Sequence, residues 1–117
     1  MKRLEDQIQK AILEHLAFRA VRDAFWFHVP NGGRRSLIEA RVFKGLGVKA
    51  GVPDLILIAN GKPYGLEIKT AQGRLSPNQC ATQALLAAAG AEVATAYGLD
   101  QALEQLNRWG LLRGSGA

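Results

Sequence analysis

Asn60-Gly61 separates two apolar runs, "DLILIA" and "YGLEIKT", and this dipeptide constrains the fold more than any other feature of the sequence. It is the strongest short signal for a two-residue type I′ hairpin, because both central positions of that turn need a positive φ. Counting outward from the turn pairs Asp54 with Glu67, on a site where side chains lie close together. Lys69 follows on the same face of the second strand. The turn therefore predicts a cluster of three charged side chains.

Two like charges that face each other across a strand pair destabilise a fold, and the cost rises where they are partly buried. Asp54 and Glu67 could share one proton, pair with Lys69, or hold a hard divalent cation such as Mg²⁺ or Mn²⁺. In the simpler alternative, Asp54 ends a turn after Pro53, while Glu67 and Lys69 form an ion pair on a solvated face. The residues alone leave these alternatives open.

The remaining patterns predict alternating helices and strands in one domain. Helical periodicity covers 4–22, and residues 25–29 form a short strand. Ser36 and Glu39 have the spacing of a capping box before a short helix, and Ser76 and Gln79 have it before a longer helix that stops at Gly90. A strand at 92–97 precedes a last helix capped by Asp100, whose core residues are Leu103, Leu106 and Trp109. We expect an α/β domain over 1–112, with a mixed sheet flanked by helices, and a disordered tail at 113–117.

The charge distribution favours a nucleic-acid partner, although a solubilising basic face is an equal alternative. The net charge is +5, and residues 1–49 hold ten Lys and Arg against five acids, so the whole excess lies in the first half. The single cysteine, Cys80, has no partner for an internal disulfide, and we expect it to pack inside its helix. No apolar stretch approaches the roughly 20 residues of a membrane span. We expect a protein of the reducing cytoplasm.

The opening motif resembles that of a known nuclease superfamily. "GVPD", followed at a hairpin's distance by "LEIK", resembles the PD-(D/E)xK motif. Glu5 and Gln9 in the first helix, "HVPNGG" after the first strand and "LSPNQ" after the motif are similar to the virus-type replication-repair nuclease (VRR-NUC) branch. The resemblance runs from Glu5 to about Tyr97. It implies a restriction-endonuclease-like αβββαβ core, in a protein encoded by a bacterium or a phage.

The resemblance also implies roles for individual residues. Metal ligands would be Asp54, Glu67, the backbone carbonyl of Ile68 and Glu5, for Mg²⁺ or Mn²⁺. Lys69 would position or deprotonate the attacking water, or stabilise the charge of the transition state. Gln79 has two interpretations, as half of a capping box or as a side chain pointing into the site, and we expect it to serve one of these roles at a time. The implied catalytic residues are Asp54, Glu67, Lys69 and Gln79.

The resemblance implies that the substrate is DNA, in a branched form such as a four-way junction. It also implies that the protein cuts this DNA as a homodimer. We expect the loop and short helix before the motif to border the site and to contact phosphates. The candidate DNA-binding residues are Asn31, Gly32, Arg34, Arg35, Arg41, Lys44, Lys49 and Ser76. The alternative is a nucleic-acid-binding domain that keeps a nuclease fold without activity. Asp54, Glu67 and Lys69 are all present, which favours the enzyme.

Overall fold

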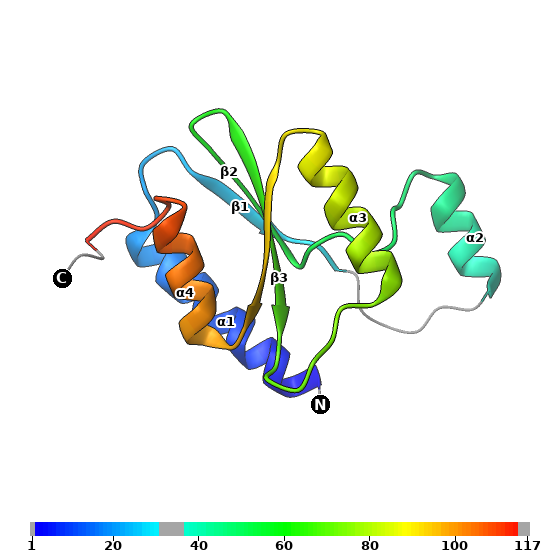
Figure 1. Cartoon of the computed structure of the whole chain (residues 1–117), viewed down its shortest axis with the longest axis horizontal. Helices are drawn as coiled ribbons and strands as arrows, with labels where there is room; N and C mark the ends of the chain where they lie inside the picture. Colours follow the sequence, from blue (N-terminus) through cyan, green and yellow to red (C-terminus); the bar gives the residue numbers. More distant parts are fainter. Residues whose placement is uncertain (1, 31–36, 115–117) are drawn as a thin grey trace.

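A computed structural model describes residues 2–30 and 37–114, and its centre is a four-stranded sheet with helices on both faces (Figure 1). The strands lie in the order β1-β2-β3-β4. Neighbours are antiparallel except β3 and β4, which are parallel and joined through α3. The elements are α1 (Lys2–Arg19), β1 (Phe25–His28), α2 (Leu37–Gly45), β2 (Leu55–Ala59), β3 (Lys62–Lys69), α3 (Pro77–Ala88), β4 (Glu92–Tyr97) and α4 (Leu99–Arg108). The predicted α/β class and order of elements are confirmed.

The hairpin between β2 and β3 has the register that the turn predicts. Asn60 and Gly61 have φ values of 54° and 74°, as a type I′ turn requires. Ala59 pairs with Lys62, and the register continues unbroken to Leu55 opposite Leu66. Asp54 is the residue before β2, so one further step of the same register brings it to Glu67.

One face of the sheet carries the hydrophobic core. Alternate residues of β2 and β3 point to this face, where α1 and α4 cover them. Ile12 and Leu16 lie one helical turn apart on α1, and both are fully buried. Leu106 on α4 is also fully buried. Leu103 and Trp109 pack against this core, as predicted. The strand residues of this layer are Leu55, Leu57, Ala59, Tyr64, Leu66 and Ile68.

The opposite face of the sheet is covered only in part. α3 lies against β4 on this face, whereas the β1 and β2 side is left open (Figure 1). Phe25, Phe27 and Ile58 point to this open side and are exposed. Asp54, Glu67 and Lys69 share the same face, because they continue the alternation of β2 and β3. The sheet thus has one closed face and one face with a charged end and an apolar end.

Two local expectations differ from the structure. Asp100 does not cap α4: the helix begins at Leu99, and Gly98, with a φ of 99°, is the capping residue, so Asp100 lies in the first turn. Cys80 is exposed on α3 rather than packed. The Arg113 side chain donates to the carbonyls of Phe18 and Ala20 at 2.7 and 2.9 Å, at the end of α1, and 115–117, the rest of the expected tail, lie outside the described residues.

The short helix predicted after Ser36 is present as α2, but its predicted cap lies outside the described residues. Within 2–30 and 37–114, no helix combines the length and apolar character needed to cross a membrane.

Candidate active site

Asp54 is held at the end of the hairpin by two strands. Its backbone carbonyl accepts a hydrogen bond from the Val29 amide at 2.8 Å, just after β1. Its carboxylate oxygen Oδ2 accepts one from the Ile68 amide on β3, also at 2.8 Å. The side chain therefore takes the place of the next backbone partner in the β2–β3 ladder. This bond holds the Asp54 carboxylate on the face of the hairpin that also carries Glu67.

Glu67 is the only buried charged or polar residue among the described residues, with 3% of its surface exposed. Its oxygen Oε2 accepts a hydrogen bond from Gln79 Nε2 at 3.0 Å and lies 3.8 Å from Lys69 Nζ. Its other oxygen, Oε1, is buried and has no hydrogen-bond partner. Leaving a buried polar atom unsatisfied costs about 1–3 kcal/mol, and more for a charged group. One carboxylate oxygen in this site is therefore anchored, and the other is available.

The pKa of Glu67 is raised from 4.5 to about 8, and burial of the carboxyl group is the largest cause. The charge of Asp54, and a side-chain hydrogen bond that one proton would allow between the two carboxyl groups, contribute to the same rise. Lys69 lowers it, and Glu5 raises it slightly. Without a cation the two carboxylates therefore repel each other, and binding of one proton removes this repulsion. The influence of Glu5 also places this α1 residue within electrostatic reach of the pair.

Gln79 serves both of its expected roles at once, which corrects the expectation that it serves one at a time. Its Oε1 accepts a hydrogen bond from the backbone amide of Ser76 at 2.8 Å. The Ser76 hydroxyl oxygen accepts one from the backbone amide of Gln79 at 3.1 Å. The Nε2 of the same side chain donates to Glu67. A primary amide has an acceptor at one end and two donors at the other, so the two roles do not conflict. The start of α3 is thereby tied to the buried carboxylate.

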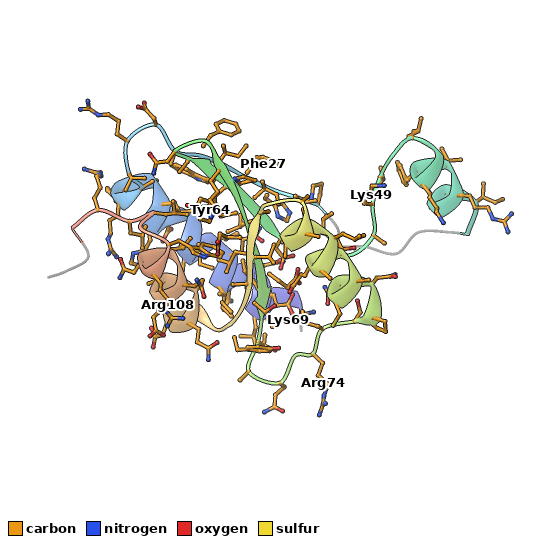
Figure 2. The ribbon with its side chains drawn as sticks, turned by 45° about the horizontal axis from the view of Figure 1, so that its top comes forward. Phe27, Lys49, Tyr64, Lys69, Arg74 and Arg108 are labelled. Carbon is orange, nitrogen blue, oxygen red and sulfur yellow. The ribbon has the colours of Figure 1, made fainter. Side chains whose placement is uncertain are left out.

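Lys69 is oriented by the loop that follows β3. A Cβ atom on Gly73 would lie 3.1 Å from both Cβ and Cδ of Lys69, so the bare backbone of this glycine packs on the lysine stem. The Lys69 side chain is 13% exposed, which leaves its ammonium group limited access to solvent. Figure 2 shows Lys69 beside β3, at the base of α3. The site therefore combines two carboxylates and one ammonium group in a confined space.

The motif "GVPD" contains two residues whose structural roles the sequence reasoning missed. Gly51 has a φ of 80°, and a Cβ there would lie 2.6 Å from the Asn78 carbonyl carbon, at the start of α3. Pro53 is fully buried, and a Cβ on Gly65 would lie 2.8 Å from its ring. Both contacts press the loop before Asp54 onto the elements that carry Glu67 and Gln79. The positive φ and the close approach could have been suspected only from the glycine itself.

The donor set fits a divalent cation, although it is small. Among residues 2–30 and 37–114, no three His, Cys, Asp or Glu side chains form a metal-binding group. Asp54 and Glu67 nevertheless offer two carboxylates, and Glu67 Oε1 lacks any other partner. The Ile68 amide points toward Asp54, and the carbonyl of a strand residue points to the same side as its amide. Two carboxylates and one carbonyl are oxygen ligands of the kind that Mg²⁺ and Mn²⁺ prefer.

The structure does not bring the basic residues of α2 to this site. Arg41 and Lys44 lie on α2, which projects beyond α3 on the side away from the sheet (Figure 1). Figure 2 places Lys49 near α2 as well, far from Lys69. Ser76 lies at the start of α3, beside Gln79. Within one chain, the short helix therefore stands apart from the site, and the expected contacts of its basic residues with DNA stay a prediction. Asn31, Gly32, Arg34 and Arg35 lie outside the described residues.

Comparison with known proteins gives no match to a family model and none to a curated protein. A solved structure named "VRR_NUC domain protein" is similar, with a TM-score of 0.76 and 27% identity over 91% of this chain and 87% of that one. Another, named "VRR_NUC domain", has a TM-score of 0.60 and 19% identity over 89% and 94% of the two chains, and shows the fold alone. Over nearly its whole length, the chain therefore has the nuclease-type fold of VRR-NUC domain proteins, and the resemblance drawn from its motifs is confirmed.

Proposed function

We propose that this protein is a metal-dependent nuclease that hydrolyses phosphodiester bonds in DNA. The nuclease-type fold of its VRR-NUC neighbours supports the general activity. One observation carries the proposal: Asp54, Glu67 and Lys69 converge at the same end of the β2–β3 hairpin, where one oxygen of the buried Glu67 carboxylate, Oε1, has no hydrogen-bond partner. A buried oxygen without a partner is typical of a site that takes up a proton or an ion, and two carboxylates beside each other favour a divalent cation.

Asp54, Glu67 and the Ile68 carbonyl would hold Mg²⁺ or Mn²⁺, with Glu5 on α1 nearby. When bound, such a cation neutralises the carboxylate pair and stabilises the negative charge that builds up on the phosphate during hydrolysis. The chain itself supplies the fixed geometry. Asp54 is held by the Ile68 amide, and Glu67 by Gln79, so neither carboxylate needs to reorganise when the cation arrives.

Lys69 acts on the phosphate and on the attacking water. Its ammonium group is held 3.8 Å from Glu67 Oε2, and Gly73 limits the motion of its stem. In this position it donates hydrogen bonds to the oxygen atoms that gain charge, and it orients water for in-line attack. Gln79 is a positioning residue, because it touches Glu67 and the start of α3 rather than the reacting atoms.

Branched DNA is the substrate that we propose, and the motif resemblance to VRR-NUC proteins is its support. Phosphate contacts from lysine and arginine give affinity without reading sequence, which suits selection of a DNA shape. The assay therefore compares linear duplex, single-stranded, flap and four-way-junction DNA of matched sequence, each with Mg²⁺, with Mn²⁺ and with a chelator.

Asp54→Asn and Lys69→Ala are the variants that test the site, and Asp100→Asn and Lys62→Ala are their controls. Asp100 is an exposed aspartate in the first turn of α4, and Lys62 is an exposed lysine at the other end of β3, paired with Glu92 at 3.0 Å. We expect metal-dependent cleavage by the wild type and both controls, and at least a roughly 10³-fold loss in both site variants. Wild-type protein that binds DNA but cuts none of the four substrates with either metal would overturn the proposal and favour a non-catalytic DNA-binding domain.

A further inference from the structure

The loop before Asp54 has little support of its own. Residues 46–53, between α2 and this aspartate, form neither a helix nor a strand. Within the described residues, α2 packs closely on no strand and no other helix, so it does not hold the loop from its other end. The position of Asp54 therefore depends on the elements that the loop touches, in addition to the two hydrogen bonds that Asp54 itself accepts.

Thr82 on α3 holds this loop. Its Oγ1 donates a hydrogen bond to the Ala50 carbonyl at 2.7 Å. A threonine inside a helix commonly donates to the carbonyl four residues earlier in the same helix. Here that carbonyl belongs to Asn78, and Gly51 of the loop packs on it, since a Cβ on Gly51 would lie 2.6 Å from the Asn78 carbonyl carbon. The threonine bond goes instead to the loop, beside this close contact.

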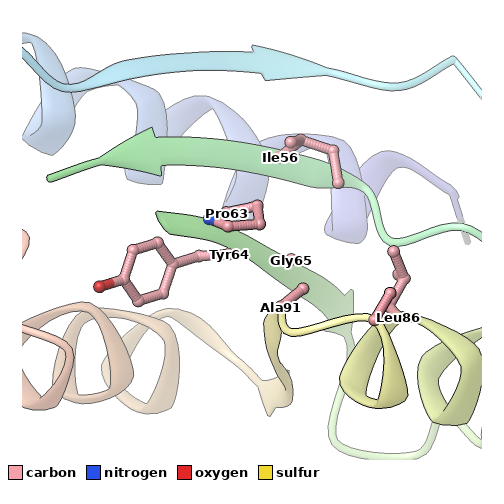
Figure 3. Close-up of a pocket in the computed structure, with 7 residues that line it drawn as sticks. Ile56, Pro63, Tyr64, Gly65, Leu86 and Ala91 are labelled. Atoms are coloured by element: carbon pink, nitrogen blue, oxygen red, sulfur yellow. The ribbon is translucent and has the colours of Figure 1, made fainter. Parts of the chain in front are cut away.

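The second half of α3 does not fix the helix against the β2–β3 hairpin. α3 packs mainly against β4. An apolar pocket of about 150 Å³ opens between the hairpin and the end of α3 (Figure 3). Ile56 and Gly65 line this pocket from the hairpin, and Leu86 and Ala89 line it from the α3 side. Because side chains do not fill this space, contacts at the start of α3 set the distance between the helix and the hairpin.

The first half of α3 is tied to both carboxylates of the candidate site. Gln79 donates directly to Glu67, at 3.0 Å. Thr82 lies three residues further along, and therefore on the same side of the helix. It binds Ala50, which is four residues before Asp54. One helix thus holds one carboxylate through a side chain and the other through a short segment of backbone.

We propose that Thr82 is a positioning residue, whose bond to Ala50 keeps the carboxylate of Asp54 beside that of Glu67. Its role toward a metal ion rests on the proposed function, because it assumes that the two carboxylates share one cation. Carboxylates that face each other repel, and the segment before Asp54 has no regular structure to resist the repulsion. The bond from Thr82 opposes a movement of this segment away from Glu67, so the pair stays close enough for one ion.

The same bond separates the candidate site from α2. The side chains of α2 and its loop for which contacts with DNA phosphates are predicted are Arg41, Lys44 and Lys49. Lys49 is the residue before Ala50, so a phosphate that pulls on these side chains pulls on the loop next to the bond. The anchor at Ala50 keeps such a movement from reaching Asp54. Thr82 thus lets α2 follow the DNA while the two carboxylates keep their geometry.

The test removes the Thr82 hydroxyl and follows the Ile68 amide, which donates to Asp54 Oδ2. Thr82→Val keeps the branched shape without a donor, and Thr82→Ser keeps the hydroxyl. Arg113→Met is the control, because it removes two side-chain bonds to backbone carbonyls at the end of α1, away from the loop. In metal-free Thr82→Val, followed by NMR, we expect the Ile68 amide to exchange with solvent at least about 10-fold faster, and the amides inside the β2–β3 ladder to stay unchanged. Thr82→Ser and Arg113→Met should keep the wild-type ratio between Ile68 and the ladder amides.

Titration with Mn²⁺ adds a second readout. The Kd for Mn²⁺ should rise at least about 10-fold in Thr82→Val and stay near the wild-type value in Thr82→Ser and Arg113→Met. An unchanged Ile68 amide or an unchanged Kd in Thr82→Val would overturn the proposal, as would Thr82→Ser behaving like Thr82→Val. Faster exchange across the whole ladder would also overturn it, because that indicates a general loss of stability. Wild-type protein that binds no Mn²⁺ would contradict the proposed function, whereas selectively faster Ile68 exchange in Thr82→Val would still support the role of Thr82 in holding Asp54.

Discussion

The β2–β3 hairpin and α2 both mix apolar and charged residues, yet they differ in where the charges and the apolar groups are held. In the hairpin, Leu55, Leu57 and Leu66 are buried, and the charged groups at its end are held by hydrogen bonds from Ile68 and Gln79. In α2, Ile38 and Val42 face solvent. The charged groups of the hairpin are hydrogen-bonded within one chain except for one buried carboxylate oxygen, Glu67 Oε1, where we propose that a metal ion binds. α2 and the residue after it expose a row of apolar side chains, Ile38, Val42 and Leu46, to solvent.

Truncating one buried residue of the hairpin and one exposed residue of α2 should give the largest difference in stability. We expect Leu66→Ala to lower the free energy of unfolding by about 2–5 kcal/mol, because it leaves a cavity in the core. Ile38→Ala should change it by less than about 0.5 kcal/mol when the protein is dilute and monomeric. Urea unfolding measures both values. Equal losses would mean that α2 packs inside its own chain.

Gly51→Ala and Gly47→Ala separate the close contact at the site from simple backbone strain. Both glycines have a positive φ, but a Cβ on Gly47 meets open space, whereas one on Gly51 meets the backbone of Asn78. Each change should cost about 1 kcal/mol of strain. Only Gly51→Ala should also shift the start of α3, lowering the proposed nuclease kcat by roughly 100-fold. Single-turnover cleavage and thermal unfolding distinguish the two effects, and equal kcat values would refute the role of Gly51.

The pH dependence of stability should reveal the buried carboxyl pair in the metal-free protein. The pKa of Glu67 is about 8 in the fold and near 4.5 in the unfolded chain, so the native state binds more protons between these values. The stabilisation is complete below about pH 4.5 and is lost as the pH rises through 8. Glu67→Gln, which carries no titrating group, should remove this decline and raise the stability at pH 8. Thermal melts in chelator across this range provide the measurement, and parallel curves for the two proteins would contradict it.

The sequence predicted the hairpin well because its signals are local and stereochemical. Asn60-Gly61 needs positive φ, and that single requirement set the register and brought Asp54 to Glu67. The capping box at Ser76 is equally local. Both features are decided by residues within a few positions of each other, so tertiary packing has little opportunity to override them.

The features that failed depend on packing between distant segments. Asp100 was a reasonable cap, but the parallel pairing of β4 ends in a turn at Gly98, and the helix begins there. The position of α2 could not be predicted, because its periodicity gives an apolar face without saying which surface receives it. The double role of Gln79 requires that the start of α3 lie against Glu67, which is a tertiary contact.

The central claim is that Asp54 and Glu67 form a metal site, and calorimetric titration with Mn²⁺ tests it most directly. We expect saturable binding by wild-type protein and by Glu92→Gln, an exposed glutamate paired with Lys62 on the same sheet. Glu67→Gln should fold and lose that binding, because it keeps the shape of the side chain and removes the charge. Wild-type protein without saturable Mn²⁺ binding, or Glu67→Gln binding as tightly as wild type, would contradict the account.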